Sequence, residues 1–127
     1  MAVEFLSEEW VSLQRVLGAE LPARPGASGR LQYTVTGAPG EVVYWLAWED
    51  GRVVDGGLGP DPAAEVMLVA PRPLAAELAS GRVEPSVAFM QGRMKTSGDQ
   101  AALLRVLAVT ATPEYEAAIR TSAERTA

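Results

Sequence analysis

The stretch "LAAELASGRVEPSVAFMQGRMKTSGDQAALLRVL", residues 74–107, decides the fold. It begins with a helical pattern that Gly81 ends, at the place where helices commonly close on a glycine. Residues 93–97 lie between two glycines and predict a short strand. Asp99 is a predicted N-cap, and the leucines after it form an apolar stripe at helical spacing. The stretch therefore predicts a helix, a late strand and a further helix.

The chain ahead of this stretch predicts a helix followed by strands. Ser7 is a predicted N-cap, and apolar residues at helical spacing follow it as far as Gly18. The Asp50-Gly51 pair predicts a tight hairpin between two apolar runs. Strands are predicted at residues 31–36, 41–50, 52–58 and 64–70. This order of elements predicts one α+β domain over residues 1–127.

Composition excludes several classes of function. The chain has 127 residues, a net charge of −5, no histidine and no cysteine. A net negative charge argues against binding to nucleic acid or to anionic membranes. No apolar run reaches the length of a membrane span, so no stable membrane insertion is expected. The ends "MAVEFLSEEW" and "SAERTA" resemble neither a signal peptide nor a peroxisomal address, and we expect a cytoplasmic protein.

The polar residues do not predict catalysis, a metal site or a cofactor. The carboxylates are scattered and suit helix starts, turns and caps. Lys95 and Ser97 share one side of the predicted strand, but no base accompanies them, and a solvated strand face explains them better. We therefore expect a protein that is not an enzyme, with no catalytic residue, no metal ligand and no cofactor.

Four short motifs in the second half of the chain resemble those of the sterol carrier protein 2 (sterol-transfer) family. They are Gly81-Arg82, Ala88-Phe89, residues 92–95 and Gly98-Asp99. The resemblance implies a five-stranded mixed, mostly antiparallel sheet with helices on one face. It also implies non-catalytic binding or transfer of an apolar ligand, such as a sterol, a fatty acid or a fatty acyl-CoA, in a tunnel between the two layers. On that fold Arg93 and Lys95 point to solvent and Met94 points inward.

The resemblance and the apolar pattern together nominate a set of ligand-binding residues. Methionines beside a leucine-rich helix form adaptable apolar walls, although the same residues would also suit a solid core. The predicted ligand-binding residues are Phe89, Met90, Met94, Leu103, Leu104 and Leu107, with Trp48 and Trp10 as further wall.

Two alternative functions remain open at this point. Alternation along the strands places Trp45, Met67 and Val69 on the sheet face opposite the helices, and an uncovered apolar stripe there predicts a possible homodimer. The chain would then be an assembly module with a solid core. The second alternative is an accessory domain of an enzyme, for which this sequence supplies no catalytic group.

Overall fold

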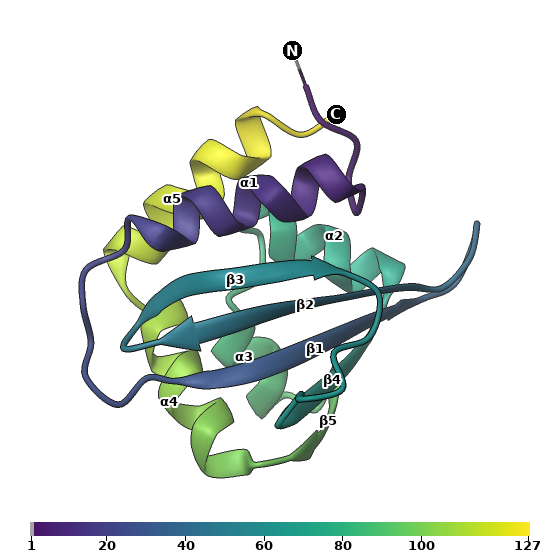
Figure 1. Cartoon of the computed structure of the whole chain (residues 1–127). Helices are drawn as coiled ribbons and strands as arrows, with labels where there is room; N and C mark the ends of the chain where they lie inside the picture. Colours follow the sequence, from purple (N-terminus) through teal and green to yellow (C-terminus); the bar gives the residue numbers. More distant parts are fainter. Residues whose placement is uncertain (1) are drawn as a thin grey trace.

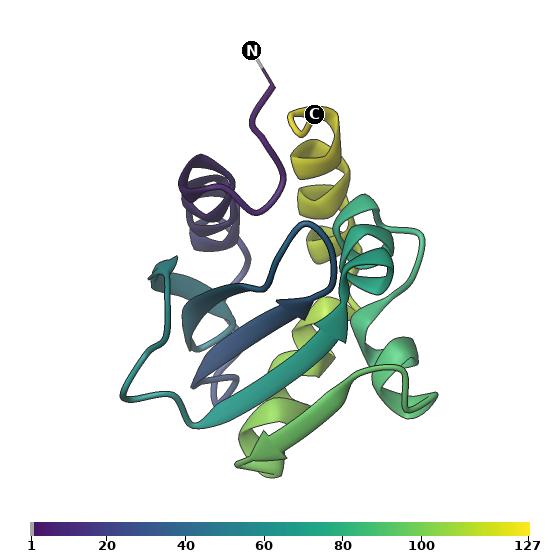
Figure 2. The same ribbon diagram turned by 90° about the vertical axis from the view of Figure 1, so that its right-hand side faces the viewer.

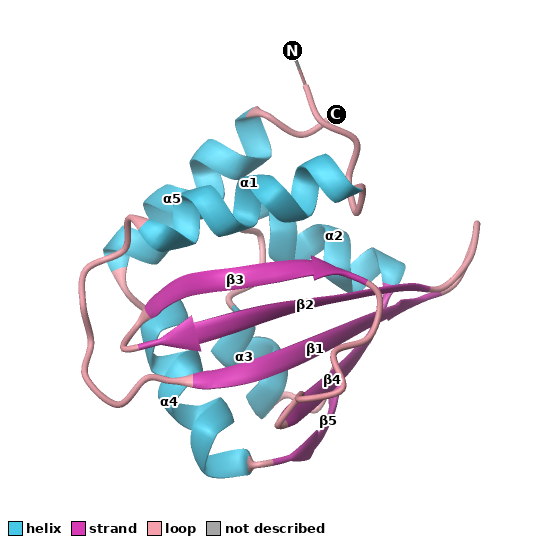
Figure 3. Ribbon diagram, in the orientation of Figure 1, coloured by secondary structure: helices cyan, strands magenta, loops and turns pink. Residues whose placement is uncertain are grey.

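The computed structural model describes residues 2–127, which form a five-stranded sheet and five helices. Figure 1 and Figure 3 show the sheet as one layer with helices packed against it. The strand order is β3-β2-β1-β4-β5. This is the α+β fold class that the sequence predicts. The strands are β1 (Gly29–Thr36), β2 (Val42–Glu49), β3 (Arg52–Leu58), β4 (Val66–Pro71) and β5 (Lys95–Gly98).

The central strand β1 makes the sheet mixed. It pairs antiparallel with β2 and parallel with β4, while β2–β3 and β4–β5 are antiparallel. Asp50 and Gly51 form the predicted hairpin, with φ values of 47° and 85°. Positive φ at both central residues gives the turn a twist that suits an antiparallel pair.

The last strand begins later than the sequence predicts, at Lys95 instead of Arg93. The backbone N–H of Arg93 donates to the Ala88 carbonyl at 3.0 Å, so it closes the preceding helical turn and is not available to β4. As predicted, Arg93 and Lys95 are exposed and Met94 is buried.

Five helices lie on one side of the sheet. Ser7 caps α1 by accepting from the Trp10 N–H, and Asp99 caps α4 by accepting from the Ala102 N–H. Figure 2 views the layers from the edge of the sheet that β5 forms. The helices are α1 (Glu8–Ala19), α2 (Arg72–Ser80), α3 (Pro85–Met90), α4 (Gln100–Thr110) and α5 (Pro113–Glu124).

The two ends of the described chain hold α1 and α5 together. The Val3 N–H donates to the Arg125 carbonyl at 2.7 Å, and the Ala127 N–H donates to the Val3 carbonyl at 2.8 Å. Further along the same helices, Gln14 Nε2 donates to the buried Ser122 hydroxyl at 2.8 Å. Figures 1 and 2 both show the termini close together beside these helices. The C-terminal half of α5 is therefore fixed to α1.

The helices are short relative to a bilayer. Within the described residues, none of them combines the length and the apolar character needed to cross a membrane.

Candidate ligand-binding cavity

A cavity of about 130 Å³ lies between the sheet and the helices. Alternate residues of β1, β2 and β4 form its floor, and side chains from all five helices form its walls and roof. Strand alternation explains the floor, because Leu31 and Tyr33 point to the helices while Arg30 and Gln32 point away. The lining includes Phe5, Trp10, Leu31, Tyr33, Tyr44, Leu46, Trp48, Leu68, Ala75, Leu78, Met94, Leu103, Leu107, Tyr115 and Ile119.

Aromatic rings make up one part of the wall. The Trp10 ring meets Tyr44 edge-on with centroids 5.3 Å apart, and Phe5 meets Trp10 in the same way at 5.1 Å. Tyr33 and Tyr44 are cross-strand partners and stack at 4.7 Å, with 9° between their planes. These contacts fix the rings, so this part of the wall is rigid.

Burial keeps the tyrosine hydroxyls of the wall protonated. Desolvation raises the pKa of Tyr33 to about 12, although the nearby Trp48 indole acts in the opposite direction. Desolvation also raises the pKa of Tyr44 and of Tyr115, and the neighbouring phenols add to the shift. At neutral pH all three hydroxyls therefore remain uncharged hydrogen-bond donors.

The rest of the wall is uncharged as well. Among the described residues, those that line the cavity include no aspartate, glutamate, lysine or arginine. Two of its polar side chains are already bonded within the chain: Thr110 Oγ1 donates to the Leu107 carbonyl at 2.6 Å, and Gln14 donates to Ser122. The cavity is therefore suited to an uncharged or largely apolar occupant.

A second hollow of about 330 Å³ adjoins the cavity and reaches the surface. It reaches the exposed residues Ser80, Glu116 and Arg120. Tyr115 and Ile119 of α5 line both spaces and stand between them. Leu78, Pro85 and Thr110 are also common to both.

The structure brings five of the eight predicted ligand-binding residues to the cavity. They are Trp10, Trp48, Met94, Leu103 and Leu107, which all line it and are at most 8% exposed. Their contact with a ligand stays a prediction.

Two of the eight residues face solvent, and their placement in the wall was wrong. Met90 is 83% exposed because α3 is a short helix whose inward positions are taken by Ala88 and by Phe89. Leu104 is 55% exposed, since it lies one residue away from the inward stripe of α4 that begins at Leu103. Phe89 packs against the core without lining the cavity.

Several lining residues were absent from the predicted set. Val106 and Thr110 continue the inward stripe of α4 at the spacing i+3 and i+7 from Leu103, and this spacing was visible in the sequence. Tyr115 and Ile119 have the i, i+4 spacing of one helix face, but nothing in their sequence indicates which face meets the cavity.

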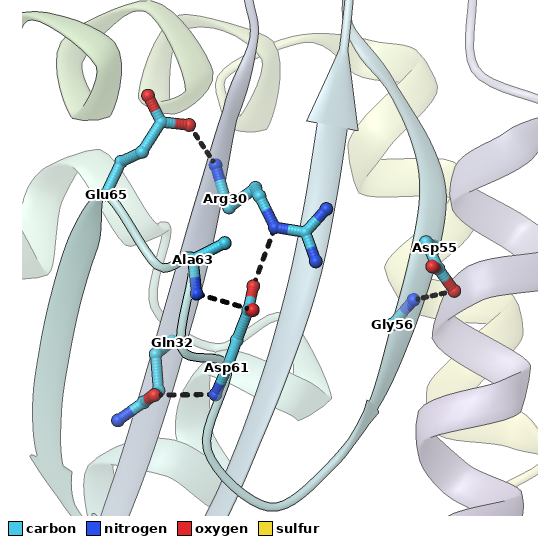
Figure 4. A network of polar contacts seen from close by, with 7 residues as sticks. All are labelled: Arg30, Gln32, Asp55, Gly56, Asp61, Ala63 and Glu65. Atoms are coloured by element: carbon cyan, nitrogen blue, oxygen red, sulfur yellow. Dashed lines mark hydrogen bonds and ion pairs between the residues drawn. The ribbon is translucent and has the colours of Figure 1, made fainter.

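The opposite face of the sheet carries a polar network, which Figure 4 shows. Arg30 Nε donates to Asp61 Oδ2 at 2.8 Å, and the Arg30 N–H donates to Glu65 at 3.0 Å. Asp61 also accepts from the Ala63 N–H at 2.9 Å, and its own N–H donates to the Gln32 side chain at 3.0 Å. The hydrogen bond from Arg30 is the main cause that lowers the pKa of Asp61. The network ties the β3–β4 connection to β1.

This outer face holds the residues of the predicted homodimer. The Arg30 guanidinium lies 4.8 Å from the centroid of Trp45, while Met67 is 46% exposed and Val69 is partly buried. The helix α5 lies on the other side of the sheet and does not cover them. The homodimer stays a prediction.

No arrangement that would support metal binding is present in the described part of the chain: it contains no group of three or more histidine, cysteine, aspartate or glutamate residues that could hold a metal ion. Lys95 and Ser97 are both exposed, away from the cavity.

Comparison with known proteins gives one family and several structures of the same fold. The SCP-2 sterol transfer family matches residues 13–110. A crystal structure of sterol carrier protein 2 has a TM-score of 0.72 and 21% identity, and the match covers 97% of this chain and 100% of that one. A solution structure from Thermus thermophilus, of a conserved hypothetical protein that is possibly a sterol carrier protein, has a TM-score of 0.74 and 24% identity, with 97% and 93% covered.

A third structure is that of a palmitated sterol carrier protein 2-like protein from Aedes aegypti. Its TM-score is 0.64 at 19% identity, and the match covers 88% of this chain and 96% of that one. No curated protein matches the sequence. The family match ends where α4 ends, so α5 and its two cavity residues lie beyond it.

Proposed function

Because the chain belongs to the SCP-2 sterol transfer family, we propose that its cavity binds a lipid and shields it from water during transfer. The observation that carries this proposal is an uncharged cavity between sheet and helices, walled by aromatic and aliphatic side chains. Sterols, fatty acids and fatty acyl-CoA are the ligand classes under consideration. A relative with the same fold is palmitated, which supports an acyl chain among them.

Sequestration needs no chemical step. Each methylene group that leaves water for an apolar wall contributes about 0.8 kcal/mol, so the apolar part of a lipid supplies most of the binding free energy. The wall carries no charged side chains, so no charge of the protein loses its water when the lipid enters. We therefore propose a binding and transfer protein that performs no catalysis.

A whole lipid requires more room than this cavity offers. Small-molecule sites measure roughly 300–1,000 Å³, whereas this cavity measures about 130 Å³. Moving Tyr115 and Ile119 aside would join it to the surface hollow of about 330 Å³. The C-terminal half of α5 is fixed to α1 through Ser122, so the first turns of α5 are the part that can shift. In this proposal they form the passage for the ligand.

The proposal is tested by titration with N-phenyl-1-naphthylamine, an uncharged fluorescent probe, followed by energy transfer from tryptophan. Ala75 lines the cavity and Ala76, its neighbour in α2, is exposed. We expect saturable binding near one probe per chain, weakened at least tenfold by Ala75→Phe, which fills the cavity. Ala76→Phe adds the same ring outside and is expected to leave the affinity unchanged. Absence of saturable binding, or equal affinity in both variants, would contradict the proposal.

A further inference from the structure

Two indole groups in the cavity wall have no hydrogen-bond partner. The Nε1 atoms of Trp10 and of Trp48 are buried, and neither finds an acceptor in residues 2–127. The two side chains are 4% and 6% exposed, and both line the cavity. Buried donors in folded proteins are nearly always paired, with protein groups or with water, so two unpaired donors at one cavity leave a place for an acceptor from outside the chain.

Three phenol hydroxyls add to the donors of the same wall. Tyr33, Tyr44 and Tyr115 line the cavity; each is protonated at neutral pH, as an ordinary phenol is, and burial raises its pKa further. The indole of Trp48 lies close enough to the Tyr33 hydroxyl to affect its ionisation, although the two do not reach hydrogen-bond geometry. A phenol can both donate and accept, whereas an indole N–H only donates, so the two indoles are the groups of this wall that require an acceptor.

The donors are not accompanied by a cation. The groups that act electrostatically on Tyr44 and Tyr115 are other tyrosines, and no arginine or lysine of the described chain lines the cavity. A carboxylate or phosphate placed there would lose its water without gaining a counter-charge, which is strongly unfavourable. A carbonyl or hydroxyl oxygen loses far less on leaving water and can accept the same hydrogen bonds.

We propose that the cavity selects an uncharged lipid and receives its oxygen-bearing head inside, on hydrogen bonds from the indoles of Trp10 and Trp48 and from the surrounding tyrosine hydroxyls. The ligand class is an ester, ketone or alcohol with an apolar chain, which extends from this head toward Tyr115 and the surface hollow. This inference rests on the proposed function, because it requires the cavity to hold a lipid.

The first test uses the three tryptophans of the unmodified protein. Their indole N–H signals are followed by ¹H–¹⁵N NMR during titration with methyl decanoate and, separately, with decane. We expect the signals of Trp10 and Trp48 to move downfield with methyl decanoate more than with decane, since decane has no acceptor. Trp45 is an internal control, because it lies on the outer face beneath Arg30. Equal shifts with both compounds would overturn the inference.

The second test compares affinities, measured by displacement of N-phenyl-1-naphthylamine at pH 8. We expect methyl decanoate to bind at least threefold more tightly than decane and tenfold more tightly than decanoate, whose head is charged. Tyr33→Phe and Tyr44→Phe should each weaken methyl decanoate about threefold to tenfold, as the loss of one hydrogen bond does. Both variants should weaken decane less than they weaken methyl decanoate, because decane has no acceptor. Their thermal unfolding confirms that they fold.

The outcomes separate this inference from the proposed function. If none of the three compounds displaces the probe, the cavity holds no lipid and both proposals fail. If decane and methyl decanoate displace the probe with equal affinity, or if decanoate binds most tightly, lipid binding stands. Only the inference that the oxygen-bearing head lies inside the cavity is then overturned. Weakening of decanoate by Arg120→Gln, with no effect of Tyr33→Phe on methyl decanoate, would place the head at the surface hollow.

Discussion

The two faces of the sheet are made from the same strands, yet their polar groups differ in hydrogen bonding. On the outer face, Arg30 and Gln32 both bond to Asp61 and fix the β3–β4 connection. On the inner face, Trp48 has a donor that is buried without a partner. The polar groups on the outer face thus form hydrogen bonds that hold the fold together. The indole N–H of Trp48 on the inner face remains free to donate a hydrogen bond to a bound molecule. This difference supports the proposal that the inner face receives a ligand.

The largest expected effect comes from removing apolar volume on the inner side. Leu103 is fully buried against the cavity, and Leu104, the next residue of α4, is 55% exposed. Leu103→Ala should lower the free energy of unfolding by about 2–5 kcal/mol. Leu104→Ala should change it by less than about 0.5 kcal/mol. Urea denaturation of both variants measures this, and similar losses would remove the distinction between the two sides of α4.

Alkaline pH should act on the inner face. Burial raises the pKa of Tyr33 to about 12, above the value near 10 of an unfolded chain. The contribution of Tyr33 to the free energy of unfolding is therefore fully present below pH 10. It is lost as the pH rises toward 12, because the phenol of the unfolded chain ionises first. Tyr33 alone should account for a loss on the order of 2 kcal/mol. Tyr33→Phe should flatten the fall in unfolding free energy between pH 9 and 12, and an unchanged slope would contradict this.

Acidic pH should act on the outer face. The hydrogen bond from Arg30 lowers the pKa of Asp61, so the carboxylate supplies stability above the unfolded value of about 4 and loses it as the pH falls through its lower folded value. At pH 7, Asp61→Asn should cost about 1–2 kcal/mol, near the low end for a hydrogen bond to a charged group, because solvent screens the partly exposed Arg30 side chain. The difference between variant and parent should shrink as the pH falls from 5 to 3. A difference in unfolding free energy that stays constant over this range would show that the charge of Asp61 does not cause the loss.

Strand alternation and helix caps were readable in the sequence. Trp48 was expected on the helix side of β2 and Trp45 on the other side, and the structure places them so. Ser7 and Asp99 were expected as caps and bond accordingly. These features depend on near neighbours in the chain, and local patterns therefore determine them.

Features that depend on distant contacts were not readable. The helix α3 is too short for a periodic pattern, so the outward direction of Met90 could not be predicted. The tie between Arg30 and Asp61 joins residues 31 positions apart. Tyr115 reaches the cavity because α5 packs against α1, α2 and α4. Each of these requires the tertiary structure.

The smallest expected effect separates two tryptophans of one strand. Trp45 receives the Arg30 guanidinium on the outer face, and Trp48 lines the cavity. Trp45→Phe keeps an aromatic ring beneath the guanidinium, and should cost about 0.5 kcal/mol or less from a weaker cation–π contact. It should leave the affinity for N-phenyl-1-naphthylamine unchanged, as measured by the fluorescence of the probe under direct excitation. Trp48→Phe alters the cavity wall and should change that affinity. If Trp45→Phe changes it as much, the two faces are coupled through the sheet and are not independent, and the outer network then takes part in shaping the cavity.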